Sequence, residues 1–465
     1  MEKRVFLPIA LLFVTALAYA QSEGTLSFMN SLPQVSYNNP AFVAPYKVAV
    51  SLPSSSMVVF YSNNGFSYSD LISRVNDSTK VDLTKFNSAL KSKNYITQAL
   101  QDDMLRFCIK INPKLVLTFS STAKTYSQFM FPKDMIGIFA NGTQPYIGKT
   151  ATVSPQFDAT MFIESAMGGS YRINENLTIG ARFKWLKGLA NVNTQNATLN
   201  LAVDPANYAL TVNADASIRT SGIQNFGQSG FNLSKSYSSY LQNNGLAVDL
   251  GATYRLNKLM LGASLIDIGY INWRNNTYQY SLNSTATYTF QGIDLGKVIS
   301  GNSDYLKSEG DSIQNKFKFK ETPMGSYRTS IPGKMYLSAM YELMKNFTAG
   351  AVFFSEKYRD RISPGVTLGV TKNFGRWFTA AGTYTLSNTS ANNLGMGMSL
   401  NLPGVQIFAV GDNLLGIPLS GQYLNKYINS LQYFNLRLGL NLVFGRDKNP
   451  SKKQATDPPV KPQEP

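Results

Sequence analysis

The stretch Phe434–Phe444, FNLRLGLNLVF, alternates large apolar residues with smaller or polar ones. The positions between the apolar residues carry two asparagines, an arginine and a glycine, and Val443 is the one exception. A period of two predicts a β-strand with two different faces. In a water-soluble sandwich the apolar face would meet a core, whereas in an outer-membrane barrel it would meet lipid and the polar face would meet a wet lumen.

The first 20 residues have the pattern of a secretory signal peptide. Glu2, Lys3 and Arg4 precede an apolar run that ends in Ala18-Tyr19-Ala20, a small-x-small cleavage pattern. The run is shorter than the ~20 residues of a membrane-spanning helix, which disfavours the alternative of an N-terminal anchor. We therefore expect residues 1–20 to be a signal peptide and the mature chain to be exported.

The composition agrees with a sheet that has one lipid face. Charged residues make up 15% of the chain, against about 25% in typical soluble domains. Aromatic residues reach 12%, which suits the aromatic girdles of a membrane barrel. An exported array of β-sandwiches remains the alternative.

The chain lacks residues on which common catalytic and metal sites depend. It has no histidine, and its single cysteine, Cys108, excludes an internal disulfide. We expect neither an enzyme nor a bound cofactor or metal, because no phosphate loop or nucleophile elbow is present. The net charge of +16 is spread along the chain. Together with export, this argues against nucleic acid and favours an anionic membrane surface or an anionic ligand as partner.

Other stretches alternate in the same way and predict further strands: Leu177–Trp185, Leu246–Leu256, Met335–Leu343 and Met396–Leu402. Short turn sequences, such as Asn112-Pro113-Lys114, Asn174-Glu175-Asn176, Asn257-Lys258 and Pro403-Gly404, join these runs at one end. The connections at the other end are long, over residues 62–102, 124–155, 222–245 and 291–333. This asymmetry is typical of an outer-membrane barrel whose short turns are periplasmic.

We therefore predict an all-β fold, a transmembrane antiparallel β-barrel over residues 47–445 with roughly 14 strands. A further alternating hairpin, 197–203 and 208–218, turns at Asp204-Pro205-Ala206-Asn207 and raises the number to about 16 if it joins the wall. In such a barrel an arginine at Leu438 or Leu440 costs about 2–4 kcal/mol in the lipid, and we expect arginine at the lumen position Asn441 to be milder. Residues 446–465, rich in Pro and Lys, predict a disordered periplasmic tail.

Two segments within the long connections have helical signals. Asp82 is placed to cap a turn that brings Leu83, Phe86 and Leu90 to one side. Pro132 opens a short helical run that stops at Asn141-Gly142. Both segments are interpreted either as helices on the barrel rim or as a lid or plug over the lumen.

The sequence Tyr37-Asn38-Asn39-Pro40-Ala41-Phe42 precedes the first predicted strand. Its Asn39-Pro40-Ala41 resembles the signature at the N-terminal hatch of FadL-type long-chain fatty acid transporters and their PorV-type relatives. With the segment Ser264–Trp273 and the alternating C-terminal strand, the chain also resembles an uncharacterised family of Bacteroidota outer-membrane proteins. The residues alone fit a turn into the barrel wall as well, because Asn and Pro favour turns.

The resemblance implies a hatch over residues 21–46 and residence in the outer membrane of a Gram-negative bacterium. Likeness to FadL implies passive uptake of small hydrophobic or amphipathic molecules, and likeness to PorV implies an accessory barrel in protein secretion. The corresponding partners are outer-membrane lipid and lipopolysaccharide, with either a hydrophobic small molecule or a secretion-system protein. The residues themselves also favour a plug, because this segment is too apolar for a solvated tail.

Charged residues occur on the predicted lumen face of several strands: Arg182, Lys184, Asp249, Arg255, Glu342, Lys372 and Arg437. They are interpreted either as a salt-bridge network that holds a plug or as a basic relay, led by Arg182, Lys184, Arg255 and Arg437, for the carboxylate or phosphate of a ligand. The segment Asp267–Trp273 predicts a bulge with a girdle tryptophan, or else a kinked strand that opens a lateral gap.

Overall fold

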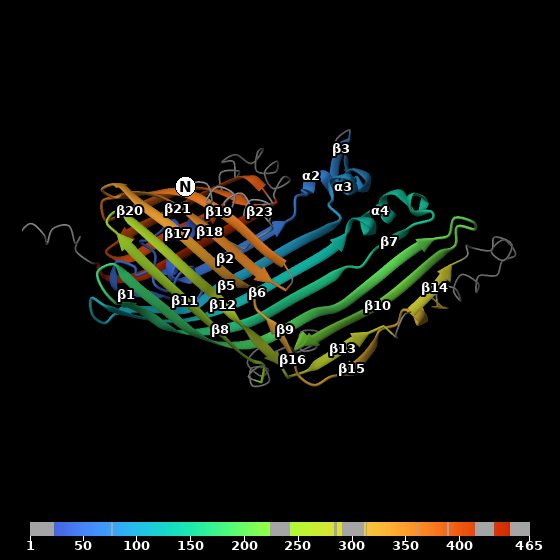
Figure 1. The fold of residues 1–465 in the computed structure, drawn as a ribbon, viewed down its shortest axis with the longest axis horizontal. Coiled ribbons are helices and arrows are strands. Elements are labelled where there is room, and N and C mark those ends of the chain that lie inside the picture. The colour runs from blue at the N-terminus through green and yellow to red at the C-terminus, as the bar shows by residue number, and fades with distance from the viewer. Residues whose placement is uncertain are drawn as a thin grey trace, which may run out of the picture.

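The computed structural model describes residues 23–75, 78–223, 242–282, 286–290, 311–312, 314–359, 361–387, 390–413 and 432–446. The predicted signal peptide and all but the first residue of the predicted tail lie outside these ranges. The main sheet is antiparallel and closed, with 14 strand positions (Figure 1). The last strand pairs with its predecessor on one side and with the first strand position on the other, which closes the ring. The predicted all-β barrel is confirmed.

Nine positions are single strands: β5 (Lys93–Lys110), β6 (Leu115–Pro132), β9 (Leu177–Val203), β18 (Phe347–Tyr358), β19 (Arg361–Phe374), β20 (Phe378–Ser387), β21 (Ser390–Leu402), β22 (Gly404–Asp412) and β23 (Tyr433–Arg446). In the other five, short strands lie end to end: β1 (Tyr46–Ser51) with β2 (Ser56–Asn63), β7 (Thr150–Thr152) with β8 (Gln156–Arg172), β10 (Leu210–Ser221) with β11 (Asn244–Leu256), β12 (Leu259–Trp273) with β13 (Thr277–Ser281) and β14 (Ala286–Phe290), and β15 (Lys320–Pro323) with β16 (Tyr327–Ser330) and β17 (Gly333–Met344).

The final strand, β23, has the two faces that its sequence predicts. Leu438 and Phe444 are 48% and 52% exposed on the outside, whereas Arg437 and Asn441 are 1% and 0% exposed on the inside. Outward-facing apolar side chains on other strands, such as Trp185 and Leu250, are exposed in the same way. An apolar outer surface of this kind is the lipid-facing band of a membrane barrel.

The predicted short turns all lie at one end of the barrel, called the short-turn end below. Asn112 and Asn174 form the same turn, because the side-chain oxygen of each accepts hydrogen bonds from the backbone nitrogens two and three residues later. Asn257 and Asn346 have φ values of 50° and 64°, and Gly404 has a φ of 80°, the left-handed conformations that tight hairpins require. The opposite end is called the long-loop end.

Two of the predicted long connections are shorter than expected because the strands beside them are longer. β5 already begins at Lys93 and β6 continues to Pro132, each with 18 residues. A strand needs only about 9–11 residues to cross the hydrocarbon layer. Beyond the lipid, both faces meet water or polar loops, so the apolar alternation fades while the hydrogen-bonded ladder continues, as in the pair Thr97 and Gln128.

The hairpin of β9 and β10 does not raise the number of strand positions to 16. The first part of β9, a strand of 27 residues, pairs with β11, and its second part pairs with β10. β10 and β11 therefore follow one another along the same edge, and the hairpin extends existing positions past the long-loop end (Figure 1). The turn at Asp204 is confirmed, because its carboxylate accepts from the backbone nitrogens of Ala206 and Asn207.

The two predicted helices are present beside the ends of β5 and β6 (Figure 1). In α3 (Leu83–Ala89), Asp82 accepts the backbone N–H of Lys85 at 2.8 Å, and α4 (Lys133–Asn141) stops at Gly142, with a φ of 69°. A small core formed by Phe66, Phe86, Leu90 and Phe131 holds these helices to the rim, together with Leu71 of α2 (Tyr68–Leu71). The chain continues from α2 into a separate hairpin of β3 (Ile72–Val75) and β4 (Ser78–Val81). None of the described helices has the length and apolarity needed to span a membrane.

Candidate functional site

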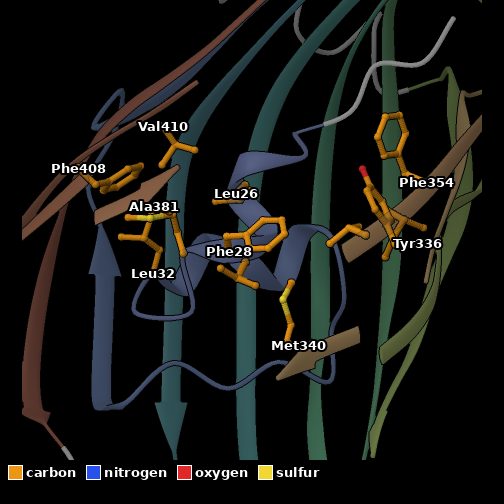
Figure 2. Packing of buried hydrophobic residues seen from close by; sticks show 13 residues of the cluster. Leu26, Phe28, Leu32, Tyr336, Met340, Phe354, Ala381, Phe408 and Val410 are labelled. Atoms are coloured by element: carbon orange, nitrogen blue, oxygen red, sulfur yellow. The ribbon is translucent and has the colours of Figure 1, made fainter. Parts of the chain in front are cut away.

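The chain before β1 runs inside the ring of strands, and residues 23–45 are called the plug below. It contains two short 3-10 helices, η1 (Thr25–Phe28) and η2 (Pro33–Tyr37). Five large apolar plug side chains are at most 2% exposed: Leu26, Phe28, Met29, Leu32 and Val35. They pack against wall residues that come mostly from β17 to β22: Ile266, Tyr336, Met340, Val352, Phe354, Ala381, Phe408 and Val410 (Figure 2). The plug and this side of the wall therefore share an apolar core.

Polar side chains of the wall hold the plug at both ends of this apolar contact. The backbone nitrogen and the hydroxyl of Thr25 donate to Asp412 Oδ1 at 3.2 and 2.6 Å. Nearer the short-turn end, the amides of Gln34 and Asn441 exchange two hydrogen bonds of 2.7 and 3.0 Å. The expectation that arginine is mild at Asn441 is therefore wrong, because that position faces a packed plug rather than water.

Arg437 on β23 binds the first described residue of the plug. Its Nε and Nη2 each donate to one carboxylate oxygen of Glu23 at 2.8 Å, which is the bidentate geometry of a strong charge-assisted pair. The Arg437 side chain is 1% exposed, and its Nη1 lies 3.7 Å from Asp103 Oδ2. A buried guanidinium needs such partners to offset its desolvation.

Tyr37 of the plug is surrounded by three arginines of the wall. The guanidinium carbons of Arg106, Arg182 and Arg437 lie 4.3, 5.3 and 5.1 Å from the centroid of its ring. The phenol donates to Asp103 Oδ1 at 2.8 Å. Burial, and then the Asp103 carboxylate, raise the pKa of Tyr37, so the hydroxyl remains a donor.

The motif Asn39-Pro40-Ala41 both turns the chain and docks on the wall. Asn39 Oδ1 accepts the Ala41 backbone N–H at 2.9 Å, which closes a local turn. Asn39 Nδ2 donates at 3.1 and 3.2 Å to the carbonyls of Ala252 and Ala263, on β11 and β12. The two wall glycines below the motif have no room for a side chain: a Cβ on Gly180 would lie 2.3 Å from the Pro40 carbonyl carbon, and one on Gly251 2.1 Å from Asn39 Oδ1.

A second group of charged side chains, called the ionic cluster, lies on β6, β8, β9, β11 and β12. It contains three cations and three carboxylates: Lys124, Arg182, Lys184, Glu164, Asp249 and Asp267. Lys124 Nζ lies 2.7 Å from Glu164 Oε2, and Lys184 Nζ lies 2.9 Å from Asp249 Oδ1. Arg182 Nε donates to Asp249 Oδ2 at 2.8 Å, and Lys184 also pairs with Asp267. All of these partners belong to the wall.

The predicted lumen charges thus have different surroundings. Arg182 and Lys184 lie together in the ionic cluster, and Arg437 meets Arg182 only across the Tyr37 ring. Arg255 is exposed at the short-turn end, where it contacts Met260 Sδ at 3.9 Å and lines a cavity of about 410 Å³ below the plug. Arg182, Lys184 and Arg437 all have acidic partners, as the salt-bridge interpretation requires.

Sequence reasoning missed several charged groups of the lumen: Glu23, Asp103, Arg106, Lys124 and Glu164. Asp103 and Arg106 lie beside a β-bulge in β5, where the register shifts between Asp103 and Leu105 and the alternation is broken. Lys124 lies in the segment 124–155, which the sequence predicts to be a loop. Among the described residues no group of acidic or cysteine side chains is placed to bind a metal.

The predicted bulge at Asp267 is present, but the girdle tryptophan is wrong. Asp267 has a φ of 59°, and its backbone nitrogen donates to Asp249 Oδ1 at 2.8 Å. Trp273 lies six residues further on, an even spacing, so it shares the lumen side with Asp267. It is 0% exposed, packs with Phe162, Leu186, Ile271 and Tyr327, and donates to Thr329 Oγ1 at 2.8 Å.

Strand pairing is interrupted beside the same bulge, where the alternative prediction places a lateral gap. The ladder between β12 and its neighbours is interrupted between the pair Ile266–Lys334 and the pair Tyr270–Ser330. Within this interval the Ile331 nitrogen donates to the Gly269 carbonyl at 3.3 Å. On the lumen side, this part of β12 is backed by the ionic cluster and by the packed residues around Trp273.

Solved structures similar to this chain are outer-membrane barrels of low sequence identity. A TodX deltaS2S3 mutant monoaromatic hydrocarbon channel is 10% identical, with 92% of this chain and 96% of that chain covered and a TM-score of 0.43. The toluene transporter TodX of P. putida is 8% identical, with 93% and 97% covered and a TM-score of 0.39. A Pseudomonas aeruginosa FadL homologue is 10% identical, with 93% and 100% covered and a TM-score of 0.39.

The assignment as a barrel rests on the strand pairing in this chain. No curated protein matches the chain in sequence. Residues 40–412 match the sequence model of DUF5723, described as a family of unknown function. The chain therefore belongs to the DUF5723 family.

Proposed function

We propose that this protein is a passive, non-enzymatic channel of the Gram-negative outer membrane for small hydrophobic or amphipathic molecules, closed at rest by its plug. The observation that carries the proposal is a pair of apolar clusters that face into an otherwise polar lumen. Tyr336, Phe354 and Phe408 face inward on one side, and Phe162, Leu186 and Trp273 face inward on the other. A porin for polar solutes has a polar, water-filled interior, so the two inward-facing apolar clusters support passengers with an apolar part.

The plug is not part of the strand ladder, so its withdrawal would break no hydrogen bond between strands. None of the residues from 23 to 45 pairs with a strand, and the plug joins the barrel only at Tyr46, at the short-turn end. In the orientation expected for bacterial barrels this end is periplasmic, which also places the tail after β23 in the periplasm. Withdrawal toward the periplasm would break side-chain hydrogen bonds and apolar contacts while the strand ladder remains intact.

A disulfide that locks the plug tests the proposal. The hydroxyls of Ser31 in the plug and Ser399 on β21 lie 3.2 Å apart, close enough for cysteines at these positions to form a disulfide. The pair is introduced in a Cys108→Ser background, which removes the chain's single natural cysteine. Cells carrying the protein are then given 1-N-phenylnaphthylamine, a neutral hydrophobic dye, and its entry is followed by fluorescence.

We expect the protein to speed dye entry, the oxidised Ser31→Cys/Ser399→Cys variant to stop this entry, and a reductant to restore it. The Ser31→Cys variant alone is the matched control and should behave like the parent. If the oxidised variant admits dye as fast as the parent, the plug does not gate passage. If the protein never speeds entry of the dye, the channel proposal fails.

A second candidate, an accessory barrel that binds another protein, is favoured by the extension at the long-loop end. β9 and β10 continue well beyond the length that lipid requires, together with β13, β14 and β15 (Figure 1). Such an accessory barrel would pass no dye in either redox state and would copurify with a stoichiometric protein partner.

A further inference from the structure

The first seven residues of the plug have the chemical layout of an amphipathic ligand. Glu23 presents a carboxylate to Arg437, and Leu26, Phe28 and Met29 follow as an apolar segment within three to six residues. The carboxylate is held by two hydrogen bonds of 2.8 Å, and the three apolar side chains are at most 1% exposed. Their surroundings are aromatic and aliphatic wall residues such as Tyr336, Phe354 and Phe408 (Figure 2).

Arg437 differs from the cations of the ionic cluster in the origin of its closest partner. Arg182, Lys184 and Lys124 each pair with carboxylates of the wall, at distances of 2.9 Å or less. Arg437 makes its bidentate pair with the plug, and the nearest wall carboxylate, Asp103, is 3.7 Å away. Departure of the plug would leave the ionic cluster neutral but would remove the bidentate partner of Arg437, whose next carboxylate is Asp103.

In the pair of Glu23 and Arg437, the Glu23 side chain is the more exposed to solvent. Its side chain is 19% exposed, whereas that of Arg437 is 1% exposed. Glu23 binds at the level of Arg437, and Gln34 binds at Asn441, closer to the short-turn end of β23. Thr25 binds Asp412, which pairs with Asn435 still nearer the long-loop end. An oxyanion that enters from the long-loop end therefore meets the part of the plug that holds Glu23 and Thr25 before it meets Gln34.

We propose, building on the channel function above, that Glu23–Met29 is an internal competitor for amphiphiles with an oxyanion headgroup. The headgroup of the ligand replaces the Glu23 carboxylate on Arg437, and its apolar tail replaces Leu26, Phe28 and Met29 against the wall. Ligand and plug cannot occupy this site together, so binding of the ligand displaces the plug. The competitor is tethered and hence present at a high effective concentration, which keeps the barrel closed when ligand is scarce.

The test uses the full chain in lipid nanodiscs and two probes with the same tail, dodecanoate and uncharged 1-dodecanol. Glu23→Gln keeps the size of the side chain but removes the competing charge. We expect dodecanoate to bind about tenfold more tightly to E23Q than to the parent, because hydrogen bonds to charged groups are worth ~1.5–3 kcal/mol. The affinity for 1-dodecanol should be unchanged. Glu175→Gln, at an exposed turn, is the matched control and should change neither affinity.

A double variant, Glu23→Gln/Arg437→Gln, removes both charges and leaves no new unpaired guanidinium. It should bind dodecanoate no better than 1-dodecanol, which would assign the headgroup preference to Arg437. Equal gains for both probes in E23Q would mean that the substitution merely loosens the plug, and the competitor proposal would fall. Unchanged affinity for dodecanoate in E23Q would overturn it as well.

The outcome is separable from that of the channel proposal. Dye entry uses an uncharged probe and the plug lock, so it can succeed while headgroup selectivity fails. Tighter binding of dodecanoate to E23Q without any dye entry would support the competitor and reject the channel.

Discussion

The two charged regions of the lumen resemble one another in sequence but differ in what they hold. The ionic cluster joins wall to wall, through pairs such as Lys184 with Asp249. The contacts of Arg437 and Asp412 join wall to plug, through Glu23 and Thr25. A buried charge that loses its partner is costly in either region. The difference is that we expect loss of a partner in the first region to destabilise the barrel, and loss of a partner in the second region to release the plug.

The largest effect is expected in the ionic cluster. Lys184→Met would leave three buried carboxylates with two cations, Lys124 and Arg182, and should lower the free energy of unfolding by about 3–5 kcal/mol. Urea unfolding, read from the gel mobility of the folded barrel, measures this. Arg255→Met, at an exposed cation on the same lumen face, is the control and should stay within about 0.5 kcal/mol of the parent. Equal stability of the two variants would contradict the importance of the cluster.

The next effect separates the plug from the wall. Gly180→Val places a side chain where Pro40 docks, since even a Cβ would lie 2.3 Å from the Pro40 carbonyl carbon. Valine suits a strand, so we expect a folded barrel with an undocked plug and a larger, steady conductance in planar bilayers. Gly382→Val is the matched control, because a Cβ there meets nothing within 4 Å. A Gly180→Val variant that folds and conducts like the parent would show that the motif does not hold the plug.

Much of the barrel could be predicted because lipid imposes a strict period on the strands. The alternation in β23, the turns at Asn112 and Asn257 and the cap at Asp82 are local signals, and all of them are confirmed. Beyond the lipid the outer face need not be apolar, so the extensions of β5 and β6 carry no such signal and their lengths are not predicted. The alternation over 197–203 does predict a strand, but not that it continues the strand at Leu177–Trp185 as one β9.

The partners within the lumen could not be predicted from local pattern. Thr25 and Asp412 are 387 residues apart in the chain, and only the closed ring brings them together. In the sequence, polar lumen residues have the pattern of a solvent-exposed face. No local signal shows which of them the plug buries. Asn39-Pro40-Ala41 was singled out as a motif, but the glycines that make room for it, Gly180 and Gly251, were not.

A smaller effect is expected at one anchor of the plug. Thr25→Val removes the hydroxyl that donates to Asp412 at 2.6 Å but keeps the backbone contact and the shape of the side chain. A hydrogen bond to a charged group is worth about 1.5–3 kcal/mol, so single-channel recordings should show more frequent openings while unfolding of the barrel is unchanged. Thr289→Val, at an exposed threonine of β14 beyond the lipid, is the control. Fewer openings than in the parent would contradict the assignment of Thr25 as an anchor.

The smallest effect is expected at Trp273. It decides whether the residues packed around Trp273 stabilise the wall or hold the plug. Trp273→Phe keeps an aromatic ring beside Tyr327 but loses the N–H that donates to Thr329 Oγ1 at 2.8 Å. The neighbours of Trp273 are wall residues throughout, so its contribution should appear in unfolding and not in conductance. We expect a loss of about 1 kcal/mol, the usual net worth of one hydrogen bond, plus a small packing penalty, with channel openings as in the parent. An increase in openings without loss of stability would place Trp273 with the plug contacts instead. The residues packed around Trp273 would then be part of the gate.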